Sequence, residues 1–407
     1  MIHDYYLGRQ PIYDGEQQVI GYELLFRQRD GAWRTPVDGD QATSRVIMHS
    51  FWELGLSRVV GNHKAFINVT RGFLLDPELL PPPGPQLVLE ILEDIIIDDE
   101  VTAAVRELKA RGYTIALDDF VYHEDLEPLV ALADIVKLDV KELGAERLAE
   151  HTQVLRLHSL KLLAEKVETP EVYEYCAGLG FDYFQGYFLC RPRVLTGKRM
   201  PANRINALRL MAGLQARNLD LASLEKIISE DPALSYRLLR YINSAAFSPS
   251  SPIRSIRHAI VYLGENEIRR WATLLALAGI DDKPEALITT SLIRARMCEL
   301  IAALEGERGK ESAFIVGLFS TLDAIMDLPM EDVLTSLPLS SEITDALLHH
   351  AGPFAHALDI TLSHERGDWD ALEREDAIGD VISTIYLEAL EWVERITPTV
   401  HHNIGQR

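Results

Sequence analysis

Polar side chains that could do chemistry recur at the ends of apolar runs in the first half of the chain. The set comprises Glu23, Asn68, Glu90, Asp118, Asp119, Lys137, Glu165 and Gln185. From Asn68 through Glu90, Asp118, Lys137, Glu165 and Gln185 the steps are 22, 28, 19, 28 and 20 residues. Each step is about the length of one strand–helix unit. A lone acidic residue at a strand end is usually solvated, but this recurrence indicates one shared site.

The donor types in this set predict a site for divalent cations. Carboxylate and amide oxygens select hard ions such as Mg²⁺ or Mn²⁺ rather than Zn²⁺. Five carboxylates and one amide are more than a single octahedral ion with several waters takes from a protein. Two ions are therefore expected, with the adjacent pair Asp118 and Asp119 as the bridge. Two neighbouring metal ions suit hydrolysis of a phosphodiester.

The overall charge limits which ligands the chain can bind. Acidic residues outnumber basic ones by 62 to 40, which gives a formal net charge of −22. A surface this negative repels nucleic-acid backbones and anionic lipids, so neither DNA, RNA nor a membrane surface is an expected partner. A ligand that carries phosphate therefore needs a local cation, from a metal ion or from a placed Arg or Lys.

The sequence lacks signals for export or membrane insertion. Residues Met1–Tyr5 do not have the basic-then-apolar run of a secretion signal. The apolar run Trp271–Ile280 is about half as long as the roughly 20 residues of a membrane helix. Cys176, Cys190 and Cys298 are too few and too scattered for a disulfide framework or a zinc site. These features predict a cytoplasmic protein.

Strands and helices that alternate over nearly 200 residues must position the polar set. Near-continuous apolar runs at Lys64–Val69, Gln86–Ile91, Thr114–Asp118 and Asp134–Leu138 are typical of strands buried on both faces of a parallel sheet. The alternation fits either a doubly wound sheet or a (β/α) barrel. In a barrel the carboxyl ends of the strands meet at one face, so the polar side chains would converge there. The convergence favours the barrel.

The second half of the chain follows a different pattern. Residues Leu195–Pro201 contain turn formers without periodicity, which indicates a linker. Beyond them Asp231 and Pro232 form a helix-start signal, and Gly264 breaks a second helical pair. We therefore expect a barrel domain over residues 1–195 and an all-helical domain over residues 196–407.

The polar set also carries a resemblance to a known family. The motifs are Glu23-Leu24-Leu25 with Arg27, Phe66-Ile67-Asn68-Val69, Glu90-Ile91-Leu92-Glu93, Asp118-Asp119-Phe120, Lys137-Leu138-Asp139, Ala164-Glu165-Lys166-Val167-Glu168 and Gln185-Gly186-Tyr187. In this order they resemble the motifs of the EAL family of cyclic di-GMP phosphodiesterases. The resemblance covers residues 1–195.

The resemblance implies a fold, a reaction and two metal ions. The fold is an α/β structure, a (β/α)8 TIM-like barrel of EAL type. The reaction is hydrolysis of one phosphodiester bond of cyclic di-GMP, which gives linear pGpG. One ion, Mg²⁺ or Mn²⁺, would be held by Glu23, Asn68, Glu90 and Asp118. The other would be held by Asp118, Asp119 and Glu165.

The same resemblance implies roles for the remaining polar residues. Lys137 would orient or help to deprotonate the attacking water. Gln185 and Glu168 would support the site, and Arg27 would contact a ligand phosphate. The expected catalytic residues are Lys137, Glu165, Glu168 and Gln185, and the expected ligand-binding residues are Arg27 and Gln185.

Three positions depart from the family's motifs. Leu24 replaces the alanine of the signature, and Leu92 replaces a threonine. Val121 replaces the glycine after Asp-Asp-Phe, and Tyr122-His123-Glu124-Asp125 stands where active members carry a Gly- and Ser-rich loop. In the family that loop supports the metal-binding aspartates and couples dimerisation to turnover. The last departure therefore bears on catalysis more than on binding.

The helical half resembles an HDOD domain, a relative of HD phosphohydrolases that lacks their metal-binding His-Asp pair. The resemblance rests on Glu230–Leu234, Leu238–Phe247 and Ile256–Gly264. At the place of the His-Asp pair we find Leu318–Asp323. The resemblance implies a regulatory or interaction domain that binds an unidentified protein partner.

Three functions therefore remain open. The first is a metal-dependent cyclic di-GMP phosphodiesterase with a non-catalytic HDOD module, and this is the function we expect. The second is a receptor that binds cyclic di-GMP without hydrolysing it, and the third is a protein-interaction scaffold. Homodimerisation is also left open.

Overall fold

The structure is a computed structural model. It describes residues 5–28, 56–191, 202–216, 219–243, 252–277, 279–280, 283–306, 309–379 and 381–401. The expected linker, residues 195–201, lies outside the described residues, as do residues 244–247 of the HDOD-like motif. The chain forms two compact units. One comprises Met1–Arg191 with His364–Thr384, and the other comprises Pro192–Ser363 with Ile385–Arg407.

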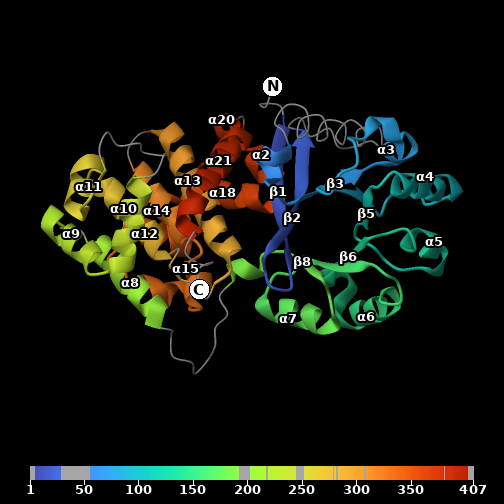
Figure 1. Ribbon diagram of the computed structural model, residues 1–407, viewed down its shortest axis with the longest axis horizontal. Coiled ribbons are helices and arrows are strands. Elements are labelled where there is room, and N and C mark those ends of the chain that lie inside the picture. The colour runs from blue at the N-terminus through green and yellow to red at the C-terminus, as the bar shows by residue number, and fades with distance from the viewer. Residues whose placement is uncertain are drawn as a thin grey trace. The chain divides into compact units, whose positions relative to one another are not determined.

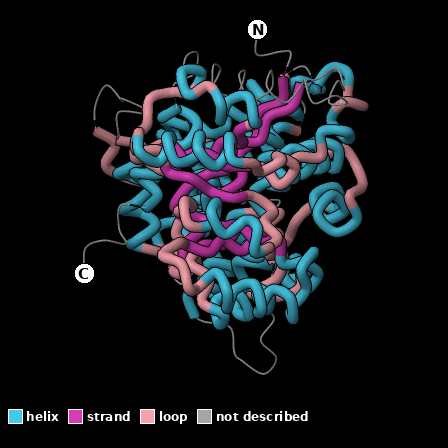
Figure 2. The backbone as a smooth tube through the Cα atoms, turned by 90° about the vertical axis from the view of Figure 1, so that its right-hand side faces the viewer, coloured by secondary structure: helices cyan, strands magenta, loops and turns pink. Residues whose placement is uncertain are grey.

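The first unit is a closed barrel whose strands follow one another in chain order (Figure 1; strands magenta in Figure 2). The strands are β1 Tyr5–Asp14, β2 Val19–Gln28, β3 Lys64–Val69, β4 Leu87–Ile91, β5 Thr114–Leu117, β6 Ile135–Asp139, β7 Lys161–Glu165 and β8 Tyr183–Gln185. Strands β2 to β8 pair in parallel, which confirms the expected barrel.

Strand β1 differs from a regular (β/α)8 barrel because it runs antiparallel to both neighbours, β2 and β8. A tight turn joins β1 directly to β2. In this turn Asp14 Oδ1 accepts hydrogen bonds from the backbone N–H groups of Glu16 and Gln18, at 2.9 Å and 2.8 Å. A two-strand hairpin must be antiparallel, whereas parallel neighbours need a crossover.

Helices connect the parallel strands. In the barrel unit they are α2 Leu56–Val60, α3 Arg71–Leu75, α4 Asp99–Ala110, α5 Glu127–Val130, α6 Val140–Leu155 and α7 Pro170–Leu179, with single 3₁₀ turns η3 Pro77–Leu79, η4 Glu124–Leu126 and η5 Phe188–Cys190. The side chains of Asp98, Asp139 and Thr169 cap α4, α6 and α7 by accepting hydrogen bonds from first-turn N–H groups. These caps fix where each crossover helix begins.

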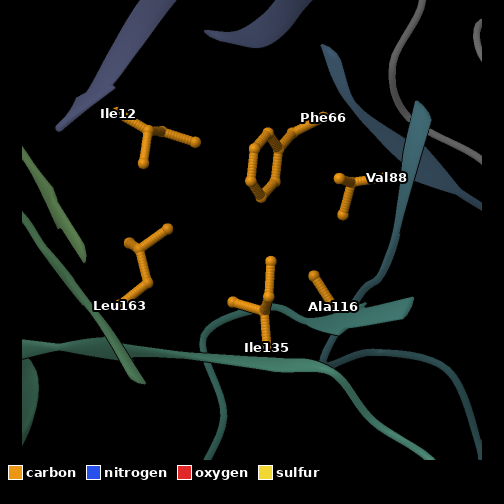
Figure 3. Packing of buried hydrophobic residues seen from close by; sticks show 6 residues of the cluster. All are labelled: Ile12, Phe66, Val88, Ala116, Ile135 and Leu163. Atoms are coloured by element: carbon orange, nitrogen blue, oxygen red, sulfur yellow. The ribbon is translucent and has the colours of Figure 1, made fainter. Parts of the chain in front are cut away.

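A layer of apolar side chains fills the barrel interior. Figure 3 shows six of them pointing toward one another, each from a different strand: Ile12, Phe66, Val88, Ala116, Ile135 and Leu163. Each of the six is at most 4% exposed. Phe66 needs Gly21 beside it, because a Cβ there would come 2.8 Å from the Phe66 ring. The polar residues of the site lie directly above this layer, further along the same strands.

A segment from far along the chain completes the barrel unit at β1. Only Ile12–Asp14 of β1 pair with β8, so the earlier residues of β1 present an open strand edge. The Leu7 N–H donates to Ser383 Oγ at 3.0 Å, and the Leu7 carbonyl accepts from His364 Nε2 at 3.1 Å. Burial lowers the pKa of His364 to about 4, so it is neutral in this contact. The sequence did not predict that residues 364–384 belong with the barrel.

The ring of Trp369 covers the same strand. It stacks on Tyr6 with ring centroids 5.3 Å apart, and a Cβ on Gly8 would come 2.9 Å from it. Tyr187, two residues after the end of β8, donates a hydrogen bond to the Glu365 carbonyl at 2.6 Å. The segment therefore contacts β1 and the chain just after β8, next to where the barrel closes.

The second unit is helical, as expected. Its helices are α8 Ala202–Leu214, α9 Leu221–Ser229, α10 Pro232–Ile242, α11 Ile256–Leu263, α12 Glu265–Leu277, α13 Glu285–Glu305, α14 Lys310–Phe319, α15 Leu322–Met326, α16 Met330–Thr335 and α17 Ser341–His349. The remaining helices are α18 Ala355–Arg366, α19 Trp369–Leu372, α20 Asp376–Gly379 and α21 Ile382–His401, of which α19 and α20 belong to the barrel unit. Asp231 caps α10, and Gly264 ends α11 with φ of 87°, as the sequence predicted. Among the described residues, no helix is long and apolar enough to span a membrane.

The contacts of Trp369 generate a first prediction. Trp369→Ala removes the ring that covers Tyr6 and Gly8, so we expect the free energy of unfolding to fall by about 3–5 kcal/mol. Urea denaturation of the full chain measures the loss, and hydrogen exchange at β1 locates it. Leu157→Ala is the control because its side chain is 83% exposed. An equal, small loss in both variants would contradict the assignment of this segment to the barrel.

Candidate active site

The strand register turns the polar residues toward the barrel interior. Five of them follow, by two positions, a residue of the apolar layer in Figure 3. The pairs are Phe66 and Asn68, Val88 and Glu90, Ala116 and Asp118, Ile135 and Lys137, and Leu163 and Glu165. Alternate residues of a strand point to the same face, so these side chains form the next layer toward one mouth of the barrel.

Glu23 reaches the same layer through the antiparallel hairpin. The pairing of β1 with β2 shifts between Ile12 and Tyr13, and beyond the shift Gln10 lies opposite Glu23. Gln185 Nε2 donates to Glu23 Oε2 at 2.7 Å and to Gln10 Oε1 at 2.9 Å. Sequence analysis missed Gln10. The signal was a polar residue two positions before Ile12, which lies at the same mouth of the barrel as Glu23 only if β1 runs antiparallel.

Gly186 holds the end of β8 close to the chain after β7. Its φ is 145°, and a Cβ there would come 2.0 Å from the Val167 carbonyl oxygen. The Val167 N–H donates to the Gln185 carbonyl at 3.0 Å. Only glycine fits this approach, and the approach keeps Gln185 beside Glu23.

Lys137 lies at the centre of the polar layer with its side chain fully buried. Its Nζ lies 3.2 Å from Glu23 Oε2, 2.8 Å from Glu90 Oε1, 2.6 Å from Asp118 Oδ1 and 2.9 Å from Glu165 Oε1. Burial would lower the pKa of this ammonium group, but the four carboxyl groups outweigh burial and raise the pKa well above its ordinary value. Lys137 is therefore a cation in this site.

One ammonium group cannot balance four ionised carboxylates. Burial raises the pKa of Glu90 well above its ordinary value, and burial raises the pKa of Glu165 to about 8. Burial also opposes ionisation of Glu23, but Lys137 and the hydrogen bond from Gln185 bring its pKa below the ordinary value. Near neutral pH, Glu23 is thus the ionised partner of Lys137, and Glu165 with its pKa of about 8 retains a proton. Additional positive charge would favour the ionised form of Glu165 and of Glu90.

Several oxygens in this layer are buried without a hydrogen-bond partner. They are Asn68 Oδ1, Glu90 Oε2, Asp119 Oδ1, Glu165 Oε2 and Gln185 Oε1. Buried polar atoms are normally satisfied, so a cluster of unsatisfied oxygens is typical of a ligand site. Within the part of the chain that is described, no three His, Cys, Asp or Glu side chains are arranged so that they could hold a metal ion as they stand. Four of the carboxylates contact Lys137 instead, and their oxygen donors and burial fit hard divalent cations.

Asp119 lies beside a second ammonium group. Asp119 has a left-handed backbone with φ of 40°, and its Oδ2 lies 3.7 Å from Lys166 Nζ. Lys166 also pairs with Asp139 Oδ2, while Asp139 Oδ1 accepts from the N–H groups of Lys141 and Glu142 at the start of α6. The site therefore contains two groups of carboxylates, each with its own lysine.

Two further predicted site residues are Glu168 and Arg27. Glu168 pairs with Lys141 and is half-exposed, so its carboxylate faces a surface lysine rather than Lys137. Arg27 lies on β2 opposite Tyr6, and its side chain lies outside the described residues. The segment after Phe120 passes into η4 and α5, where the Tyr122 hydroxyl donates to Glu127 Oε2 at 3.1 Å.

Comparison with known proteins places the chain in a family. The EAL domain model matches residues 74–192, and the HDOD domain model matches residues 200–334. Two relatives are 34% identical to the chain over 91% and 96% of its length. The chain therefore belongs to the EAL–HDOD family.

Two of these relatives match along nearly their whole length. One is the cyclic di-GMP phosphodiesterase CdgJ of Vibrio cholerae, 34% identical over 374 residues, which span 91% of this chain and 87% of CdgJ. The other is the uncharacterized protein YuxH of Bacillus subtilis, 34% identical over 411 residues, which span 96% of this chain and 98% of YuxH.

Solved EAL structures were also found. The PaMucR phosphodiesterase in complex with c-di-GMP has 23% identity and a TM-score of 0.39, covering 50% of this chain and 99% of that chain. The manganese and cy-diGMP complex of Klebsiella pneumoniae BlrP1 has 22% identity and a TM-score of 0.39, covering 45% of this chain and 55% of that chain.

The unsatisfied oxygens generate a second prediction. Mg²⁺ or Mn²⁺ should raise the melting temperature of the full chain, because the ion binds the folded carboxylate layer and not the unfolded chain. Glu90→Ala should abolish most of this rise, since Glu90 is fully buried beside Lys137. Glu107→Gln is the control because Glu107 pairs with Arg111 on the exposed face of α4. The prediction fails if Glu90→Ala and Glu107→Gln respond to metal equally.

Proposed function

We propose that the barrel hydrolyses one phosphodiester bond of cyclic di-GMP to give linear pGpG, with two divalent cations. The observation that carries the proposal is the layer of buried, unsatisfied oxygens around Lys137. Membership in the EAL–HDOD family supports it, and so does the name of the relative CdgJ, a cyclic di-GMP phosphodiesterase. The helical domain would not take part in the chemistry.

The side chains present fit two ions, Mg²⁺ or Mn²⁺. Glu23, Asn68, Glu90 and Asp118 would hold one ion. Asp118, Asp119 and Glu165 would hold the other. Bound there, the ions supply Lewis-acid charge for a phosphodiester and for the water that attacks it. The unpartnered oxygens of Asn68, Glu90, Asp119 and Glu165 support this division.

The chain's own residues contribute position and charge. The carboxylates keep Lys137 protonated, so we assign it to orient the attacking water by donating hydrogen bonds rather than to take a proton from that water. Gln185 holds Glu23 through its Nε2, and Gln10 holds Gln185. In the overall reaction the water oxygen forms a new P–O bond, one P–O bond of the ring breaks, and the released ribose oxygen ends as a hydroxyl. Arg27 would contact a ligand phosphate, and Glu168 would support the site from its pair with Lys141.

A receptor that binds cyclic di-GMP without hydrolysing it is the second candidate. It is favoured by the segment after Phe120, where Val121 and Tyr122 lead into a short helical turn in place of the family's Gly- and Ser-rich loop. A scaffold that has lost the ligand is disfavoured, because clustered buried carboxylates are costly to keep without a ligand.

We propose an interaction or regulatory role for the helical unit, with an unidentified protein as partner. The sequence of this half contains no His-Asp dipeptide. At the corresponding place Leu322 is fully buried and Asp323 lies in the first turn of α15. The absence of DNA or RNA binding is an expectation from the charge of −22. A cytoplasmic location stays a separate expectation from the sequence, and homodimerisation stays open.

A nucleotide assay tests the proposed hydrolysis. The full chain with Mg²⁺ or Mn²⁺ should convert cyclic di-GMP to pGpG, detected by chromatography, while Ca²⁺ should permit binding without turnover because it does not demand octahedral geometry. Lys137→Met should abolish pGpG formation and leave affinity within about tenfold, or about 1.4 kcal/mol. Circular dichroism checks that this variant folds, and Glu107→Gln serves as the active control. If calorimetry shows that cyclic di-GMP binds but no pGpG forms with either Mg²⁺ or Mn²⁺, the receptor is favoured. If cyclic di-GMP does not bind, the scaffold is favoured.

A further inference from the structure

Lys166 lies directly after Glu165 with a backbone that L-residues rarely adopt. Its φ is 55°, in the left-handed region, and its side chain is half-exposed. Such backbones persist where the surrounding structure holds them, and they cluster at functional sites. Here the backbone directs the side chain toward Asp139 and Asp119.

Asp139 fixes the position of the Lys166 ammonium group. Asp139 Oδ1 is occupied as the cap of α6, with N–H groups of Lys141 and Glu142 at 2.8 Å and 3.1 Å. Its Oδ2 pairs with Lys166, and the hydrogen bond from Lys166 lowers the pKa of Asp139 against the effect of burial. Two backbone hydrogen bonds at the start of α6 hold Asp139, so its Oδ2 offers the Lys166 ammonium group a fixed partner, although α6 is kinked at Gly144.

The ammonium group lies beside a carboxylate whose other oxygen a cation would use. Asp119 Oδ2 is 3.7 Å from Lys166 Nζ, and Asp119 Oδ1 is buried without a hydrogen-bond partner. A divalent ion on Asp119 would therefore have a fixed positive charge on the other side of the same carboxylate. Like charges at this range repel, and partial burial limits how much solvent screens them.

We propose that Lys166 is a built-in cation that competes with a divalent ion for Asp119 and so weakens the metal site formed by Asp118, Asp119 and Glu165. The inference rests on the proposed two-metal function. Lys166 would act on the metal ion through Asp119, so it is a positioning residue and not a catalytic one. The ion at this site then binds more weakly than the ion near Glu23 and Glu90, and a bound phosphodiester, which brings negative charge, would favour its entry.

Titration calorimetry with Mn²⁺ in the absence of nucleotide tests the proposal. The full chain should show a stronger and a weaker binding event, and Lys166→Gln should tighten the weaker one roughly tenfold. Lys166→Arg keeps the charge and should behave like the unmodified chain. Lys161→Gln is a matched control, because Lys161 is 57% exposed against 51% for Lys166 and pairs with Asp182 at the opposite end of β7 from Glu165.

The outcomes separate this inference from the function on which it rests. If neither the unmodified chain nor the variants bind Mn²⁺, both the proposed two-metal function and the role of Lys166 are overturned. Two binding events in the unmodified chain with no change in Lys166→Gln would overturn the role of Lys166 alone and leave it as an anchor for Asp139. If Lys166 is only an anchor for Asp139, Lys166→Gln should lower the melting temperature and leave the Mn²⁺ affinity unchanged. One event in the unmodified chain and two in Lys166→Gln would support the proposal.

Discussion

The contact of one buried ammonium group with four carboxyl groups governs the first half of this protein. An isolated buried lysine would lose its proton, and four isolated buried carboxylates would take up protons or move apart. Together, Lys137 stays charged, Glu23 ionises, Glu165 holds a proton, and burial raises the pKa of Glu90. Several oxygens of this layer have no hydrogen-bond partner and could bind a metal ion.

The geometry of the barrel brings Lys137 into contact with the four carboxyl groups. The apolar layer of Figure 3 fixes which side chains point inward, and two residues further along each parallel strand the inward position is polar. A shift of one residue in the β6 register would turn Lys137 outward and put a neighbour in its place. The tight packing of Phe66 against Gly21 resists such a shift. The packing below the site thus fixes the strand register that brings Lys137 and the carboxyl groups together.

Much of this arrangement was predictable from sequence, because parallel strands impose regular intervals. The steps between Asn68 and Gln185 were enough to predict a barrel and a shared site. Gln10 was not predictable, since its place at the same mouth of the barrel as Glu23 depends on the antiparallel course of β1. Segment 364–384 was missed because its contacts with Leu7 join residues more than 350 positions apart, and no local periodicity reports such a contact. The orientation of Glu168 depends on where Lys141 lies, which a motif does not specify.

The most direct test of the account is the number of protons that the protein releases when it binds Mn²⁺. Calorimetry in two buffers of different ionisation enthalpy measures it, because a carboxyl group must lose its proton before it can bind a metal ion. At pH 7 the account predicts release of about one proton per chain, from Glu165 with its pKa of about 8. At pH 9 fewer protons should appear, since Glu165 is then already ionised. Binding of Mn²⁺ at pH 7 without proton release would contradict the central claim that one lysine leaves the buried carboxyl group of Glu165 protonated.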